Sequence, residues 1–309
     1  FPGECTRATI EALASAATGE RGAAIVGLGG GKTIDTAKGV AHALDARLVI
    51  VPTIASNDSA TSSLIVLYDD AHRVLGAQVL PRSPDVVLVD TMEIVRAPVR
   101  FFRAGIGDAL SKTFEARQCR ASGGLNFFQG RPPDAAGVMA DRCHAAIREC
   151  GAAAVQAVLR QQCTPEVETV TEATVLLSGL GFESGGLSIA HALIRGLSGV
   201  PRLSRALHGE MVTFGTVVQL VLEKRGADEI GQHLALLASM GMSASLAALG
   251  ADSLSDSELA VVADLTLAAP YTRNFERQLD AGSIVSAVLE ANAIGLERMA
   301  LSALEGTAD

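Results

Sequence analysis

The segment AAIVGLGGGKTIDTAK, residues 23–38, constrains the fold more than any other part of the chain. An apolar run over residues 23–28 meets three successive glycines, and Lys32 and Thr33 then begin an amphipathic pattern typical of a helix. A strand that stops at glycines and restarts as a helix directs free backbone N–H groups toward one point. Glycine lets an anion come close there, and the helix N-terminus favours its negative charge. The segment therefore predicts a cradle for a diphosphate.

Neither standard phosphate fingerprint fits this segment. A G-x-x-x-x-G-K-T pattern ending at Thr33 needs glycine at Val26, and a G-x-G-x-x-G pattern starting at Gly27 needs glycine at Lys32. A plain strand-to-helix turn is the alternative, although such a turn rarely needs three glycines followed by lysine. The motif thus indicates a phosphate without specifying which one.

The composition indicates a globular protein. The chain has 309 residues, which is long enough for two domains and a large core. Of these residues, 49% are hydrophobic and 19% are charged. The net charge of −9 and the lack of a basic run argue against a nucleic-acid surface. No apolar stretch reaches the length of a membrane span. The five cysteines have no C-x-x-C spacing, which predicts reduced thiols in a cytoplasmic protein.

The sequence changes texture near Pro98. Residues 1–98 alternate apolar strands, expected at 23–28, 47–51, 64–68 and 86–90, with a helix at 33–44, which predicts an α/β domain with a parallel, doubly wound sheet. Residues 99–309 predict an all-α domain, since long alanine- and leucine-rich segments have helical period. The helices are expected at 109–118, 135–150, 165–180, 210–224, 229–239, 256–267 and 282–304.

Three glycine-flanked segments in the second half contain possible metal ligands. Asp108 lies in GIGDALSKTFEAR, His191 in GFESGGLSIAHAL and His208 in LHGEMV. One carboxylate and two imidazoles with an open position suit catalytic Zn²⁺. Taken singly, Asp108 suits a helix N-cap, His191 a packed core position and His208 a loop. Beside a nucleotide cradle, the three together favour a metal site.

A hydroxyl-rich segment, PTIASNDSATSSLIVLYDD at residues 52–70, follows a predicted strand. In an open α/β sheet, ligands bind in loops beyond the carboxyl ends of the strands. A polar surface loop is the alternative, but this segment runs directly into an apolar stretch that is expected to be buried. We therefore expect Asp58 and its neighbours to line a ligand site.

The motifs GLGGGKTIDTAK, PTIASNDSATSSL, GIGDALSKTFEAR, GFESGGLSIAHAL and LHGEMVTFGT, in this order and spacing, resemble the glycerol dehydrogenases. These enzymes belong to the metal-dependent group of iron-containing alcohol dehydrogenases. The resemblance covers essentially the whole chain. It implies an α/β nucleotide domain and a helical metal-binding domain with the active site between them. It further implies NAD, Zn²⁺, oxidation of glycerol to dihydroxyacetone, and a homo-oligomer, commonly an octamer.

The resemblance also implies the roles of individual residues. The metal ligands would be Asp108, His191 and His208, and Asp58 would contact a substrate hydroxyl. The cofactor-binding residues would be Gly30, Gly31, Lys32, Thr33 and Asp35 at the diphosphate and ribose, with Thr53, Ser56, Ser62, Leu64 and Tyr68 on the nicotinamide side.

Two departures from the family pattern stand out. Iron-using relatives carry a histidine four residues after the metal-binding aspartate, where this chain has Lys112. Its absence favours three protein ligands and zinc, and we expect the ammonium to point away from a metal that would repel it. Relatives also have roughly sixty residues before the position of Phe1, about two βα units. We therefore expect an N-terminally incomplete sheet.

Three alternative functions stay open. A truncated paralogue could bind metal or partner subunits without turnover. A hydroxy-acid dehydrogenase would share the architecture without needing Asp58. A lyase resembling dehydroquinate synthase would need several basic residues for phosphate, whereas the cleft motifs offer only Lys32, Lys112 and Arg117.

Overall fold

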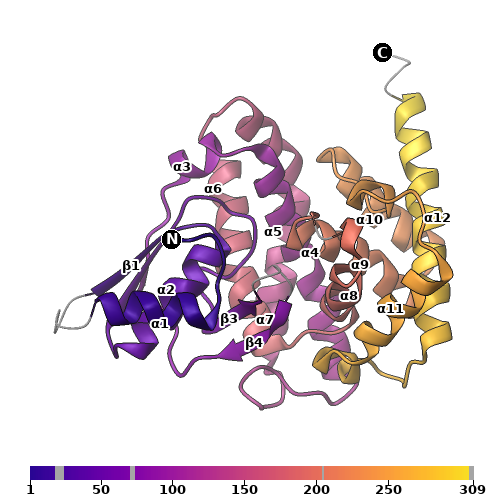
Figure 1. Ribbon diagram of the computed structural model, residues 1–309. Helices are drawn as coiled ribbons and strands as arrows, with labels where there is room; N and C mark the ends of the chain where they lie inside the picture. The colour runs from indigo at the N-terminus through magenta and orange to yellow at the C-terminus, as the bar shows by residue number, and fades with distance from the viewer. Residues whose placement is uncertain (18–23, 70–73, 204, 306–309) are drawn as a thin grey trace.

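The computed structural model describes residues 1–17, 24–69, 74–203 and 205–305. Its first part combines strands with helices, and the rest is helical, which confirms the predicted fold class (Figure 1). The strands are β1 (Ala24–Gly29), β2 (Arg47–Pro52), β3 (Leu64–Tyr68), β4 (Val74–Val79) and β5 (Val86–Val87). The helices of this part are α1 (Arg7–Ala16), α2 (Gly31–Ala43) and α3 (Thr91–Arg96).

A three-stranded parallel sheet with the order β1-β2-β5 forms the centre of the first part. Gly27 of β1 is in register with Ile50 of β2. Ile34 of α2 and Ile50 belong to the same hydrophobic core, so α2 covers one face of this sheet. On the strand β1, Val26 and Leu28 remain 59% and 61% exposed.

The predicted strand at 64–68 exists but does not join the parallel sheet. Instead, β3 pairs antiparallel with β4, with Leu64 opposite Val79. The strand expected at 86–90 covers only Val86 and Val87, and Asp90, whose carboxylate accepts from the N–H of Met92, is the N-cap of α3. The expected strand at 23–28 is β1, although its first residue lies outside the described ranges.

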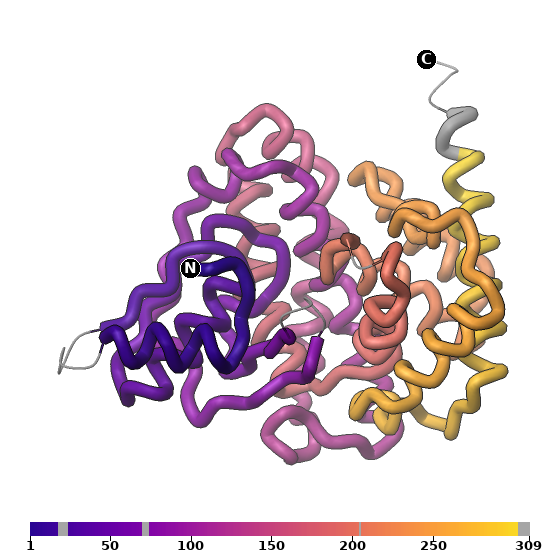
Figure 2. The backbone as a smooth tube through the Cα atoms, viewed as in Figure 1, coloured from indigo at the N-terminus to yellow at the C-terminus, as the bar shows by residue number. Residues whose placement is uncertain are grey.

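The second part is a helical bundle built around α4 (Val99–Ala121), most of whose side chains are buried. Figure 2 shows the indigo start of the chain on one side of the molecule and the orange and yellow helices on the other. The other α-helices are α5 (Asp134–Leu159), α6 (Pro165–Glu172), α7 (Ser178–Gly185), α8 (Ile189–Ser198), α9 (His208–Leu222), α10 (Ala227–Ser239), α11 (Asp256–Leu267) and α12 (Ala281–Glu305). A π-helical turn, Ala173–Leu177, joins α6 to α7.

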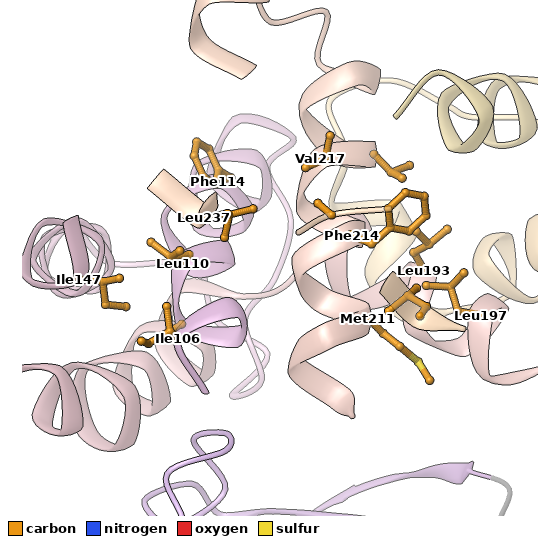
Figure 3. Packing of buried hydrophobic residues seen from close by; sticks show 14 of the residues in the cluster. Ile106, Leu110, Phe114, Ile147, Leu193, Leu197, Met211, Phe214, Val217 and Leu237 are labelled. Carbon is orange, nitrogen blue, oxygen red and sulfur yellow. The ribbon is translucent and has the colours of Figure 1, made fainter. Parts of the chain in front are cut away.

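Figure 3 shows two groups of buried side chains in the helical core. Ile106, Leu110 and Phe114 of α4 face Ile147 of α5 and Leu237 of α10. A second group, contributed by α8 and α9, consists of Leu193, Leu197, Met211, Phe214 and Val217. This packing fixes the position of α4 and therefore the position of the polar side chains on its other face.

Within the described ranges, no single helix is long and apolar enough to cross a membrane. One pair, Pro165–Gly185 with Ile189–Ser198, passes by length and composition, but it is bent by 100°. Both members of the pair contribute buried side chains to the helical core. All five cysteines are free, and three of them are buried.

Candidate metal centre

Asp108, His191 and His208 converge although they lie on three different helices. One ligand atom from each lies within 4.8 Å of the others. The Oδ1 atom of Asp108 is 3.2 Å from Nε2 of His191 and 3.8 Å from Nε2 of His208. Asp108 is not an N-cap, because it lies well inside α4 and is fully buried. His208 is the first residue of α9, and its side chain is 42% exposed.

Glycines beside these ligands let α4 and α9 approach closely. A Cβ atom on Gly209 would lie 1.8 Å from the carbonyl oxygen of Ala104, and one on Gly107 would lie 2.8 Å from the carbonyl oxygen of Gly209. No real side chain tolerates these separations, so the helices could not meet here with larger residues. The close approach puts His208 directly beside Asp108.

Glu115 orients His191 and was not identified from the sequence. Its Oε2 atom accepts from Nδ1 of His191 at 2.6 Å, while Oε1 accepts from the backbone N–H groups of Ser188 and His191. Burial alone would raise the pKa of Glu115, but His191 and Lys112 hold it below its ordinary value. Glu115 lies two turns after Asp108 on the same face of α4, a spacing that could have identified it. With Nδ1 donating to Glu115, Nε2 faces the centre with its lone pair.

The donor set fits a divalent metal ion. The Oδ2 atom of Asp108 is buried and has no hydrogen-bond partner among the described residues. A buried polar atom without a partner is rare and requires an explanation, which a metal ion would supply. Two imidazole nitrogens and one carboxylate, with the partly exposed His208 on the open side, match a three-ligand catalytic site.

Lys112 points into the centre, which contradicts the expectation that it points away. Its Nζ atom donates to Oδ1 of Asp108 at 2.5 Å and lies 3.2 Å from Nε2 of His191. It also lies 3.2 Å from Oδ2 of Asp58. Burial alone would lower the pKa of Lys112, but the neighbouring carboxylates raise it. Attraction to carboxylates in this buried environment therefore determines where the ammonium lies.

Asp58 reaches the centre on the loop between β2 and β3, residues 53–63. Its Oδ2 atom accepts a hydrogen bond of 2.6 Å from the hydroxyl of Ser178. Burial and the nearby Asp108 raise its pKa. Ser178 was not singled out in the sequence, because a serine inside an apolar helical pattern carries no separate signal.

The same loop is attached to the helical part at two further points. The hydroxyl of Thr61 donates to the carbonyl oxygen of Val175, inside the π-helical turn, at 2.8 Å. The backbone N–H and the hydroxyl of Ser63 both donate to Glu183. These contacts hold the loop across the boundary between the two parts of the molecule.

The predicted diphosphate cradle lies where β1 turns into α2. Gly29 has φ +151°, a conformation that favours glycine, and Gly30 is the N-cap of α2. A Cβ atom on Gly31 would lie 2.9 Å from Nδ2 of Asn57, so the amide of Asn57 packs directly against this turn. Lys32 pairs with Glu4 and lies 4.8 Å from the ring centroid of Tyr68, while Thr33 is half-buried. This geometry fits an anionic group at the N-terminus of α2.

Two of the predicted cofactor residues, Asp35 and Ser62, are buried beside β3. Asp35 accepts from the N–H of Val66 at 3.0 Å and from Nζ of Lys38 at 3.3 Å. The hydroxyl of Ser62 also accepts from Lys38, at 3.2 Å. Both side chains therefore bind α2 to β3. The remaining predicted residues, Thr53, Ser56, Leu64 and Tyr68, are half-buried at or between the ends of β2 and β3.

Comparison with known proteins gives consistent matches. A family model described as iron-containing alcohol dehydrogenase matches residues 1–91. Glycerol dehydrogenase from Escherichia coli O6:H1 is 40% identical, over 96% of this chain and 81% of the relative. Glycolaldehyde reductase from Halobacterium salinarum is also 40% identical, over 85% of this chain and 72% of the relative. The crystal structure of glycerol dehydrogenase from Schizosaccharomyces pombe matches with a TM-score of 0.93 and 34% identity, over 98% of this chain and 77% of that one.

Proposed function

This chain belongs to the iron-containing alcohol dehydrogenase family, and from that premise we propose that it oxidises glycerol to dihydroxyacetone with NAD and zinc. The reaction removes a hydride, which passes to NAD⁺, and a proton, which passes to solvent. The convergence of Asp108, His191 and His208, with Glu115 behind His191, is the observation that carries the proposal. The likeness to glycerol dehydrogenases supports the substrate.

The three ligands would hold the metal in the helical part of the chain. When bound, a divalent ion would act there as a Lewis acid that lowers the pKa of a substrate hydroxyl. Two imidazoles and a carboxylate with an open position suit zinc, which is why we propose zinc over other metals.

The chain's own residues prepare the site for a polyol. Glu115 would keep the proton of His191 on Nδ1, so that the lone pair of Nε2 stays available to bind a metal. Asp58 would accept a hydrogen bond from a second substrate hydroxyl, which favours substrates with adjacent hydroxyls. The N-terminus of α2 would bind the diphosphate of the cofactor through its free N–H groups.

The proposal is tested by measuring NAD⁺-linked oxidation of glycerol before and after treatment with a chelator. We expect activity to disappear and to return with Zn²⁺, and His191→Ala to lose most of its bound metal. Reduction of glycolaldehyde and oxidation of a hydroxy acid should be measured in the same assay. Full zinc occupancy in His191→Ala, or preference for a hydroxy acid, would refute the assignment. No turnover of any substrate would favour a non-catalytic role, and sedimentation would show whether the chain forms the implied homo-oligomer.

A further inference from the structure

We propose that the ammonium of Lys112 is an internal competitor of the divalent metal, which lowers the affinity of this chain for that metal. The inference rests on the proposed metal site. Lys112 is fully buried, and its Nζ atom lies 2.5 Å from Asp108 and 3.2 Å from His191. Both residues that it meets, Asp108 and His191, belong to the candidate metal ligands.

The competition follows from the single lone pair on Nε2 of His191. In a neutral imidazole whose Nδ1 donates its proton to Glu115, at 2.6 Å, Nε2 has one lone pair to offer. That lone pair can accept a hydrogen bond from Lys112 or bind a metal at about 2.0–2.1 Å, but it cannot do both. A metal must therefore displace the ammonium from His191.

The surrounding charges explain why the ammonium stays in the centre. Asp58, Asp108 and Glu115 are three buried carboxylates, and among the described ion pairs Lys112 is the only lysine or arginine partner of any of them. Without a metal, Lys112 offsets part of this negative charge. With a metal present, Asp58 at 3.2 Å gives the displaced ammonium an acceptor within reach. Because Lys112 stabilises the metal-free centre, moving it costs free energy. Metal binding is therefore less favourable by that amount.

The test is a calorimetric Zn²⁺ titration of the metal-free 309-residue chain against a competing chelator. Lys112→Met removes the charge and keeps a long apolar side chain. We expect it to bind Zn²⁺ more tightly than the wild type by roughly 10- to 100-fold, the range that residues next to metal ligands usually control. Lys38→Met is a matched control, since Lys38 is equally buried but pairs with Asp35. Its zinc affinity should equal that of the wild type.

Thermal unfolding without metal supplies a second measurement. Metal-free Lys112→Met should unfold at a lower temperature than the metal-free wild type, and Zn²⁺ should raise its unfolding temperature by a larger amount. If Lys112→Met does not fold, Lys112→Thr offers the same comparison with a shorter side chain. Equal or weaker zinc binding by the folded variant would overturn the inference, even if the wild type oxidises glycerol. Tighter binding without polyol oxidation by any variant would refute the proposed function alone.

Discussion

The hydrogen bond between Glu115 and His191 allows a precise prediction for Glu115→Gln. In the wild type, Oε1 accepts two backbone N–H groups and Oε2 accepts from Nδ1 of His191. The glutamine oxygen must stay with the two backbone N–H groups, because an NH₂ group facing them would leave both without an acceptor. The amide NH₂ then faces Nδ1, which has to become an acceptor. The imidazole proton consequently moves to Nε2.

This tautomer change has a calculable effect on metal binding. Nε2 carrying a proton cannot bind zinc, so the wrong tautomer must be reversed before a metal can enter. Loss of such a supporting carboxylate usually costs about 10- to 100-fold in metal affinity. That range corresponds to about 1.4–2.7 kcal/mol of binding free energy. Removal of a buried, hydrogen-bonded charge should also lower the free energy of unfolding by roughly 1.5–3 kcal/mol.

Two measurements check the prediction for Glu115→Gln. Long-range ¹H–¹⁵N spectra of the metal-free protein report which nitrogen of His191 carries the proton, and a zinc titration reports the affinity. Glu183→Gln is a suitable control, because Glu183 is also a buried carboxylate but binds Ser63 instead of a metal ligand. If His191 in Glu115→Gln keeps its proton on Nδ1, or if the two variants bind zinc equally well, the reasoning is wrong.

Three further predictions concern the substrate, the pH dependence and the helix contact. Asp58→Asn should lower kcat/KM for glycerol by a factor that corresponds to about 1.5–3 kcal/mol of activation free energy. The kcat/KM for a simple secondary alcohol should fall less, and equal losses would contradict a polyol-specific contact. Burial lowers the pKa of His233 from 6.5 to about 4, and neither ring nitrogen has a hydrogen-bond partner among the described residues. The unfolded chain therefore takes up the proton first, so this group should cost about 1.4 kcal/mol of stability between about pH 7.5 and pH 5.5. When unfolding by denaturant is measured at both pH values, His233→Phe should not show this part of the fall in unfolding free energy. The same pH dependence in the variant and the wild type would refute the prediction. Gly209→Ala should push α9 away from Ala104 and cost roughly 1–3 kcal/mol in unfolding free energy together with weaker zinc binding, which the same titrations would measure.

Local pattern predicted the type of most elements but not their partners. The glycine-rich segment correctly predicted β1, its turn and α2, because that information lies within one stretch of chain. The strand 64–68 was also identified, yet its pairing with β4 was not. Alternation of apolar residues specifies a half-buried strand and carries no information about its neighbour. Val74–Val79 is mostly exposed, so the partner itself lacked an apolar pattern.

The site shows the same division between local and distant information. Asp108, His191 and His208 are separated by long stretches of sequence, so their residue types and the resemblance indicated a metal site but not its geometry. The direction of Lys112 was wrongly predicted, because repulsion by a metal was considered without the attraction of Asp58 and Asp108. Asp35 was assigned to the cofactor because of its motif, and that role stays a prediction; its place on the buried face of α2 also pairs it with β3, which the motif did not indicate. The error for Lys112 arises because long-range packing decides the surroundings of a charged group.

Under the proposed function, the attachment of the β2–β3 loop would link metal and cofactor binding thermodynamically. The loop carries Asp58, which contacts Lys112 in the metal centre, and its Thr61 is bonded to the π-helical turn. The same loop provides Thr53 and Ser56, which are expected on the nicotinamide side of the cleft. Any displacement of Lys112 by a metal therefore changes the forces on the loop that the cofactor meets. Linkage is reciprocal, so the factor by which zinc alters the affinity for NAD must equal the factor by which NAD alters the affinity for zinc.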